Sequence, residues 1–246
     1  MKNHIFLQAR LKSKRFPNKV LKKICGKTII ELIVERLRKI KNIDDIILVT
    51  GPKESNTLLL EEAKRLDLKI FCGSEENVLD RFYKASKKFQ SDIITRITAD
   101  CPLIDFNVIN EGYRIFHSGD YDVINIEQRR TFPDGFDFEI FKKDALHTSW
   151  QDNLAKFDNE EQFCSTFITP VKYMVETKKF KNFNLINDVD YSHIRLTLDY
   201  PEDLEFIKQI YEELYEKNQS FALKEILELL ERKPELIEIN RKYKTS

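Results

Sequence analysis

The sequence predicts an α/β fold in which a mostly parallel sheet lies between two layers of helices. Short apolar runs rich in β-branched residues alternate with amphipathic stretches through the first half of the chain, a pattern typical of repeated strand–helix units. In stretches such as 29–40 the apolar residues recur at helical spacing. The chain has 246 residues, 41% of them hydrophobic, and we expect a single domain over residues 1–246.

The first half is expected to contain strands at 5–7, 45–50, 68–72 and 93–98, alternating with helices at 29–40, 55–66 and 77–89. Ser55 is the expected cap of the second helix. The second half is less regular, with strands predicted at 121–125 and 194–198, a Pro-Asp-Gly turn at 133–135 leading into a strand, and two helices within 142–175. Two C-terminal helices follow, and the first of them begins at Pro201.

Charge and composition exclude several classes of function. Lys plus Arg and Asp plus Glu number 41 each, so no bulk charge indicates a nucleic-acid or membrane partner. No stretch approaches the roughly 18 apolar residues that a membrane helix needs. The four cysteines form no C-x-x-C pair, and scattered thiols of this kind are typical of a reducing compartment. We therefore expect a cytoplasmic protein.

The loop after the first strand, residues 8–20, is the densest chemical signal in the sequence. Five of its thirteen residues are Arg or Lys, although the net charge of the chain is zero. At the carboxyl end of a strand, such a loop can surround a triphosphate with charge-assisted hydrogen bonds. A solvated basic loop is the alternative interpretation.

Glycine-rich phosphate loops are absent from the sequence. No two of the six glycines lie close enough to form a G-x-G, which removes the main support for a dinucleotide-binding or kinase-type site. Gly26-Lys27-Thr28 resembles the end of a P-loop, but Leu21 stands where the first glycine of that motif belongs. We interpret this tripeptide as a turn before the helix at 29–40.

Two aspartates follow predicted strands and are candidate metal ligands. Asp100 comes directly after the strand at 93–98, and Asp199 directly after the segment 194–198. Two carboxylates from neighbouring strand ends form a magnesium site that leaves positions open for phosphate oxygens. Helix capping or an Asx turn is the alternative for each of them. Asp188-Val189-Asp190 imitates a D-x-D motif but follows no clear strand, and we interpret it as a loop.

Several stretches, taken together and in order, resemble one family. They are QARLKSKRFPNKVL, GKTIIELIVERL, FCGSEENVLDRFYKA, RITADCPLID, DYDVIN, FPDGFDFEIF and IRLTLDYPEDLEFIKQIYEEL. The set is similar to the cytidylyltransferase family that includes spore-coat polysaccharide biosynthesis protein F, and more distantly to CMP-sialic acid and CMP-Kdo synthetases. The resemblance implies a three-layer α/β/α, Rossmann-like nucleotidyltransferase fold, usually dimeric.

The activity that the resemblance implies is Mg²⁺-dependent transfer of CMP from CTP to an acidic or unusual sugar, such as a nonulosonic acid, with release of pyrophosphate. Such a reaction serves surface polysaccharide or glycan biosynthesis. The implied partners are CTP, a small sugar acceptor and a second copy of the chain. The subregion 120–190 is the expected place for acceptor binding and dimer contacts.

The resemblance also assigns residues to roles, position by position. The catalytic residues would be Arg10, Arg15, Lys19 and Asp100, and Mg²⁺ would lie between Asp100 and Asp199. Asp134, Asp137 and Glu139 fall where the acceptor is expected. The nucleotide-binding residues would be Gln8, Ala9, Arg10, Leu11, Lys14, Arg15, Lys19, Gly73, Ser74, Arg81, Thr98 and Asp100.

The chain departs from the family pattern at two places. Lys12 and Asn18 stand where relatives commonly carry glycine, and Asn tolerates the left-handed backbone region that glycine adopts. The E-H-V-T-P stretch of the relatives appears here at 161–166 without its histidine, which leaves the acceptor open. A nucleotidyltransferase for a phosphorylated acceptor, a glycosyltransferase-like protein that binds nucleotide sugars and a binding protein without activity remain the alternatives.

Overall fold

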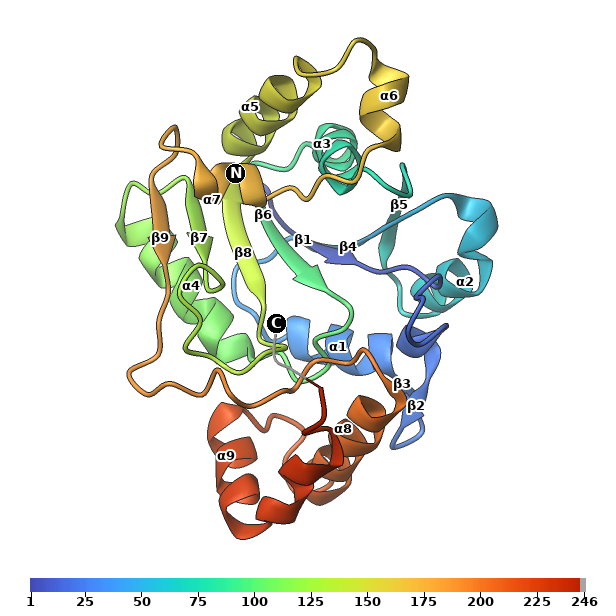
Figure 1. The fold of residues 1–246 in the computed structure, drawn as a ribbon, viewed down its shortest axis with the longest axis vertical. Helices are drawn as coiled ribbons and strands as arrows, with labels where there is room; N and C mark the ends of the chain where they lie inside the picture. The colour runs from blue at the N-terminus through green and yellow to red at the C-terminus, as the bar shows by residue number, and fades with distance from the viewer. Residues whose placement is uncertain (244–246) are drawn as a thin grey trace.

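The computed structural model describes residues 1–243 and is built around a seven-stranded sheet (Figure 1). Six strands run in one direction, and the fifth strand in spatial order runs against both of its neighbours. The predicted mostly parallel sheet is therefore confirmed. In spatial order the strands are β5 (Lys69–Cys72), β4 (Asp45–Thr50), β1 (Asn3–Gln8), β6 (Ile93–Thr98), β8 (Phe138–Lys142), β7 (Val123–Asn125) and β9 (Asn182–Asn184).

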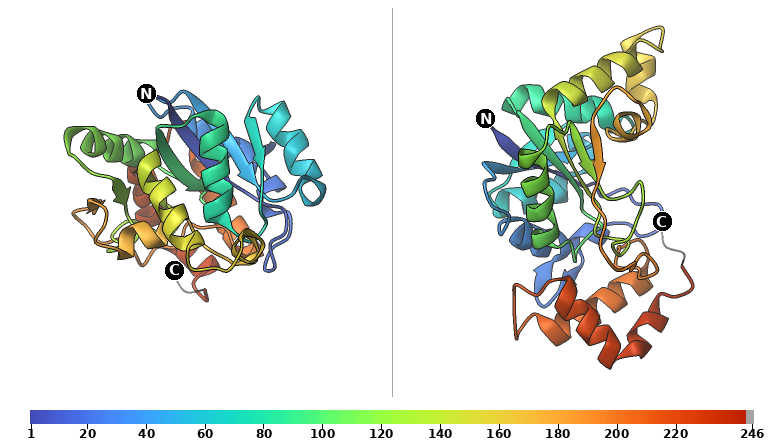
Figure 2. Two further views of the ribbon diagram at one scale, coloured as in Figure 1. Left: turned by 90° about the horizontal axis from the view of Figure 1, so that it is seen from above. Right: turned by 90° about the vertical axis from the view of Figure 1, so that its left-hand side faces the viewer.

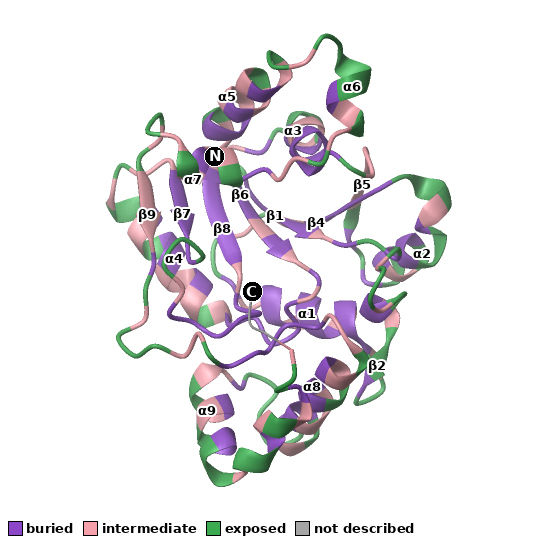
Figure 3. Ribbon diagram, in the orientation of Figure 1, coloured by how far each residue is buried: buried purple, intermediate pink, exposed green. Residues whose placement is uncertain are grey.

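Helices cover both faces of the sheet (Figure 2). The side chains of β1 alternate between the two faces: Ile5 and Leu7 enter one apolar core, and Phe6 enters the other. Both faces of the sheet are therefore apolar and need a covering layer. Figure 3 shows that the central strands are largely buried between these layers. One layer holds α3 (Val78–Phe89) and α5 (Lys143–Leu154), and the other holds α1 (Ile29–Leu37), α2 (Thr57–Arg65) and α4 (Phe106–Ser118).

Shorter and C-terminal elements complete the fold. The hairpin of β2 (Lys23–Ile24) and β3 (Lys27–Thr28) precedes α1, and α6 (Glu160–Ser165) and α7 (Lys172–Glu176) follow α5. The helices α8 (Pro201–Leu214) and α9 (Leu223–Arg232) extend the core that contains Ile5 and Leu7, and they lie below the sheet in Figure 1. Within residues 1–243, no helix has both the length and the apolar character needed to cross a bilayer.

The structure corrects the prediction at several elements. Helix α2 begins at Thr57, while Ser55 belongs to a preceding short 3₁₀ turn and does not cap it. The range 142–175 holds three helices instead of two. Helix α4 and strand β9 were not among the predicted elements. Asn18 adopts φ 57°, ψ 21°, so the left-handed backbone expected at this position is confirmed.

The segment 194–198 is extended, but the strand predicted there was wrong. Its backbone N–H groups form hydrogen bonds with two turns instead of with a neighbouring strand. Leu196 N–H donates to Asp134 O (2.7 Å), and Leu198 N–H donates to Asp100 O (2.8 Å). Only the single bridge between Asp134 and Arg195 has strand geometry. The segment therefore joins the Pro-Asp-Gly turn to the turn after β6.

Arg195 fixes this segment from within the fold. Its guanidinium is buried and pairs with Asp203 (3.0 Å) and Asp134 (3.2 Å). Asp203 also accepts from the backbone N–H groups of Asp199 (2.8 Å) and Tyr200 (3.0 Å). These bonds satisfy donors at the start of α8 and hold Asp199 in place.

Gly135 is required by the close approach of two backbones at the same turn. It adopts φ +103°, and a Cβ there would lie 2.6 Å from Leu196 C and Thr197 N.

We expect Gly135→Ala to lower the free energy of unfolding in urea by about 3 kcal/mol or more, because the new methyl group would meet this backbone. Gly26 has φ +78° with nothing within 4 Å, so Gly26→Ala should cost only the strained backbone, about 1–2 kcal/mol. Equal losses of unfolding free energy in the two variants would contradict the close packing of Gly135 against the backbone of Leu196 and Thr197.

Candidate nucleotide-binding site

A cavity opens where the carboxyl ends of β1 and β6 meet the loop after β1. We call it the first cavity. Parallel strands direct their carboxyl ends to one edge, which is where open α/β sheets bind ligands. Nine of the residues predicted for the site line this cavity together: Gln8, Ala9, Arg10, Arg15, Lys19, Arg81, Thr98, Asp100 and Asp199.

Lys19 is the buried cation of the first cavity. Its Nζ donates to Leu198 O (2.6 Å), to Asp199 Oδ1 (2.9 Å) and to Asp100 Oδ2 (3.3 Å). Burial would lower the pKa of Lys19, but the charges of Asp100 and Asp199 outweigh burial and raise it. Burial likewise opposes ionisation of Asp100, yet Lys19 and nearby hydrogen bonds hold the pKa of Asp100 below its usual value. The Lys19 ammonium and the Asp100 carboxylate are therefore charged at neutral pH.

Asp100 and Asp199 fit a divalent cation. Both carboxylates reach one nitrogen atom, so their oxygens converge on a single point at the wall of the cavity. Oxygen ligands from two carboxylates are what Mg²⁺ selects, with the remaining positions left to water and phosphate. The carboxylates come from elements 99 residues apart in the chain, and the turns described above bring them together.

Two arginines stand at the mouth of the first cavity. Arg15 Nη2 lies 2.7 Å from Asp199 Oδ1, and Arg10 Nη1 lies 3.3 Å from Glu75 Oε1. Both arginine side chains are about half exposed, at 53% and 48%. Exposed ion pairs of this kind are weak, so either guanidinium can exchange its carboxylate for a phosphate oxygen at little cost.

Arg81 is a buried residue that lines the first cavity, and two of its donors have no hydrogen-bond partner among residues 1–243. The residue is 2% exposed, and its Nε and Nη1 have no partner among residues 1–243. Burial lowers the pKa of Arg81 to about 10, and the guanidinium stays charged. A buried cation with unused donors is costly unless a ligand satisfies it, and the cavity it lines is where that ligand can enter.

Three of the predicted nucleotide-binding residues support the site from outside the first cavity. Leu11 is buried and its N–H donates to Asn56 Oδ1 (3.0 Å). Gly73 bonds through its N–H to Thr50 O. Ser74 Oγ donates to Cys164 O (2.8 Å) and accepts from Asn77 N–H (2.9 Å), which ties the start of α3 to the end of α6.

Lys14 lies beside the first cavity, not in it. It is exposed and lines a shallow neighbouring groove that it shares with Arg10 and Arg15. Its ammonium is therefore available to the outer end of a polyphosphate that extends out of the first cavity.

The three predicted acceptor residues lie in different environments. Glu139 is 2% exposed and lines a second cavity on the other side of Gln8. Burial raises the pKa of Glu139 to about 7 against the opposing charge of Arg96. Burial also raises the pKa of Asp137 to about 6, although Arg130 pairs with it. Asp134 is 1% exposed and pairs with Arg195, so it helps to hold the segment 194–198 in place.

Three residues at these cavities, Arg96, Glu75 and Phe167, were not predicted from the sequence. Arg96 was detectable as a charge in the middle of the β-branched run 93–98, and Glu75 as a charge next to Ser74. Glu75 lines the first cavity, and its Oε2 has no hydrogen-bond partner among residues 1–243. Phe167 also lines the first cavity although 63% exposed. It gave no local signal, because it reaches the cavity only through the pairing of Ile168 with Asn77.

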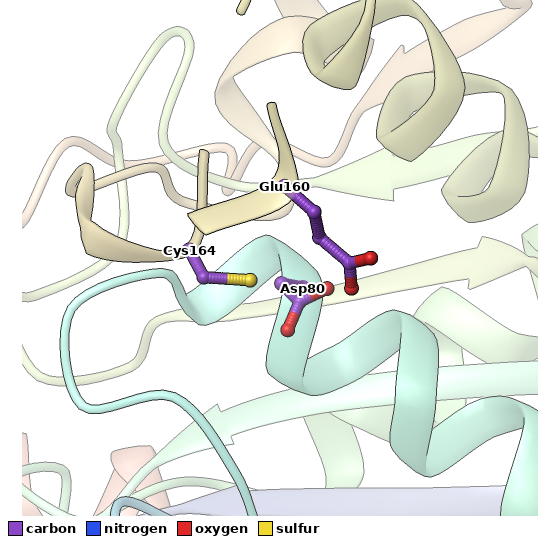
Figure 4. A group of neighbouring side chains, drawn as sticks. All are labelled: Asp80, Glu160 and Cys164. Atoms are coloured by element: carbon purple, nitrogen blue, oxygen red, sulfur yellow. The ribbon is translucent and has the colours of Figure 1, made fainter. Parts of the chain in front are cut away.

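A separate group of metal-ligand types, Asp80, Glu160 and Cys164, lies between α3 and α6 (Figure 4). A lysine already occupies this group: Lys84 Nζ lies 3.0 Å from Asp80 and 3.0 Å from Glu160. Trp150 Nε1–H also donates to Asp80 Oδ1 (3.0 Å). Unlike Asp100 and Asp199, these three residues line neither of the two cavities, and we assign the group to the packing of α6 on α3.

The chain is similar to known proteins over nearly its whole length. A model of the cytidylyltransferase family matches residues 5–228. An uncharacterised protein of Methanocaldococcus jannaschii is 32% identical over 237 residues, covering 95% of this chain and 92% of that protein. The spore coat polysaccharide biosynthesis protein SpsF of Bacillus subtilis is 27% identical over 247 residues, covering 93% and 94%. A solved cytidylyltransferase structure from Leptospira borgpetersenii has a TM-score of 0.82 at 29% identity, covering 96% and 97%.

The fold defines the class of protein as a nucleotidyltransferase. Within that class the chain belongs to the cytidylyltransferase family, and it is a CTP-dependent enzyme. The resemblance noted in the sequence to the family of spore-coat polysaccharide biosynthesis protein F is thereby confirmed. The more distant relation to CMP-Kdo synthetases is confirmed as well.

Replacing Lys19 tests the buried cation of the first cavity. Lys19→Met keeps the length of the side chain but removes the ammonium, and we expect kcat/KM for CTP to fall by on the order of 10²–10³. Lys64→Met, an exposed position on α2, is the matched control and should keep the wild-type value. The two rates would be compared by pyrophosphate release, with thermal unfolding to confirm that both variants fold. A Lys19→Met rate within about twofold of wild type would remove Lys19 from the mechanism.

Proposed function

We propose that this protein transfers CMP from CTP to a sugar acceptor, releases pyrophosphate and uses Mg²⁺ held between Asp100 and Asp199. The observation that carries the proposal is the convergence of both carboxylates and the Lys19 ammonium on one point of the first cavity. The family indicates the nucleotide, and this geometry supports placing its phosphates in the first cavity.

The basic groups are arranged for a triphosphate that leaves as pyrophosphate. Lys19 is buried beside the two carboxylates, while the half-exposed Arg10 and Arg15 lie nearer to solvent. Phosphoryl transfer needs alignment and neutralisation of charge more than covalent help from the protein. We assign Lys19 to the α-phosphate end, and Arg10, Arg15 and Lys14 to the leaving pyrophosphate. When bound, Mg²⁺ would polarise the phosphate and lower the pKa of an attacking hydroxyl.

Arg81 and Phe167 are proposed to hold the nucleobase. A guanidinium carries only donors, and cytosine presents two adjacent acceptors, O2 and N3, whereas uracil and thymine carry a proton on N3. The unused Nε and Nη1 of Arg81 therefore match cytosine better than the other pyrimidines. Phe167 offers an apolar face to the same cavity, and an aromatic face stacks on a planar base.

The acceptor is proposed to enter through the second cavity, which lies across Gln8 from the first. Arg96, a residue of the second cavity, donates from Nε to Gln8 Oε1 (3.0 Å), and Gln8 lines the first cavity. Phe167 and Thr169, two residues apart on one segment, line the first and the second cavity respectively. An acceptor hydroxyl can therefore approach the α-phosphate from this side. Homodimerisation through 120–190 stays a prediction.

Nucleotide binding can be tested by thermal unfolding with CTP, UTP, ATP or GTP, each with and without Mg²⁺. CTP at about 100 times its dissociation constant should add about 2.7 kcal/mol, a shift of several degrees for a chain of this size. We expect the largest shift with CTP and Mg²⁺, and loss of the Mg²⁺-dependent part in Asp100→Asn. A larger shift with another nucleotide would contradict the assignment of Arg81. A Mg²⁺ effect that persists in Asp100→Asn would contradict the metal site.

A further inference from the structure

A pair of stacked tyrosines lies next to Asp199, outside the first cavity. The rings of Tyr200 and Tyr243 are parallel, with an angle of 1° between their planes, and their centroids lie 3.7 Å apart. Both residues are partly buried. Because an aromatic side chain is rigid and presents a large contact area, a second ring against it restricts its movement. Tyr243 therefore holds the ring of Tyr200 in one place.

The segment 240–243, which carries Tyr243, is itself fastened to the start of α8. Asn240 is 2% exposed, and its Nδ2 donates to Asp203 Oδ1 (3.0 Å). The hydroxyl of Tyr243 donates to Glu202 Oε2 (2.9 Å). The segment is thus anchored at both of its ends, and the tyrosine stack has a fixed position relative to α8.

Arg15 reaches this stack from the loop after β1. Its guanidinium carbon lies 5.2 Å from the centre of the Tyr200 ring, a distance at which an aromatic face attracts a cation. The same guanidinium pairs with Asp199 (2.7 Å). An exposed arginine has many rotamers, and ordering it costs conformational entropy. The two contacts set the position of the guanidinium before any ligand binds.

We propose that Tyr200 and Tyr243 are positioning residues for Arg15, and that they hold its guanidinium where the terminal phosphates of the nucleotide bind. The inference rests on the proposed function, which assigns Arg15 to the leaving pyrophosphate. When a phosphate oxygen replaces Asp199 as the partner of the guanidinium, the contact with Tyr200 can stay in place. Binding then orders an arginine that is already held, which reduces the entropy lost on binding.

The direct test compares the binding of CTP and CMP, each with Mg²⁺, by isothermal titration calorimetry. CMP lacks the two phosphates that leave as pyrophosphate, so its affinity should not depend on the position of Arg15. We expect Tyr243→Ala to weaken CTP binding about two- to fivefold, as for the loss of one exposed cation–π contact, and to leave CMP binding unchanged. Tyr243→Phe keeps the stacked ring and should restore the wild-type affinity for CTP.

A double-mutant cycle links this effect to Arg15. In an Arg15→Met background, Tyr243→Ala should weaken CTP binding no further, because the cation that the stack positions is absent. Two unrelated defects would instead give additive losses of binding free energy. Thermal unfolding without nucleotide would verify that every variant is folded.

The outcomes separate this inference from the proposed function. Wild-type protein that does not bind CTP would overturn the proposed function and the inference with it. With CTP bound by the wild type, three results would overturn the inference alone: an unchanged CTP affinity in Tyr243→Ala, equal weakening of CTP and CMP, or additive losses in the cycle.

Discussion

The buried ammonium of Lys19 is the interaction on which the site depends. It bonds to Leu198 O and to the carboxylates of Asp100 and Asp199, and so joins three parts of the chain that are distant in sequence. Two carboxylates this close would repel each other without a cation between them. The ammonium therefore holds the two carboxylates in a geometry that the proposed divalent ion and phosphate could use.

The rest of the fold holds Leu198 O and the carboxylates of Asp100 and Asp199 in place relative to one another. Leu198 N–H and Thr197 Oγ1 both donate to Asp100 O, so the turn after β6 and the segment 194–198 are joined by backbone as well as by Lys19. Arg195 and Asp203 fix the start of α8 immediately after Asp199. A rigid support of this kind suits a reaction whose catalysis rests on alignment and preorganised charge.

Most of the fold could be predicted from local pattern, because β4 and β6 begin and end where their β-branched runs do. The segment 194–198 has the same pattern, but its partners are turns that only tertiary contacts create. For the site, the loop after β1 and the strand-end aspartates were visible as charges. Phe167 and the pairing of Arg96 with Glu139 depend on which segments lie side by side, and sequence spacing does not encode that.

In the proposed site, Asp100 and Asp199 bind one metal ion together with CTP. The most direct measurement is the anomalous difference map of a crystal that contains Mn²⁺ and a non-hydrolysable CTP analogue. We predict one peak within about 2.5 Å of a carboxylate oxygen of both aspartates, with the α-phosphate of the analogue on its open side. A peak between Asp80 and Glu160 instead, or a bound analogue with Lys19 still bridging the two aspartates and no metal beside them, would contradict the account.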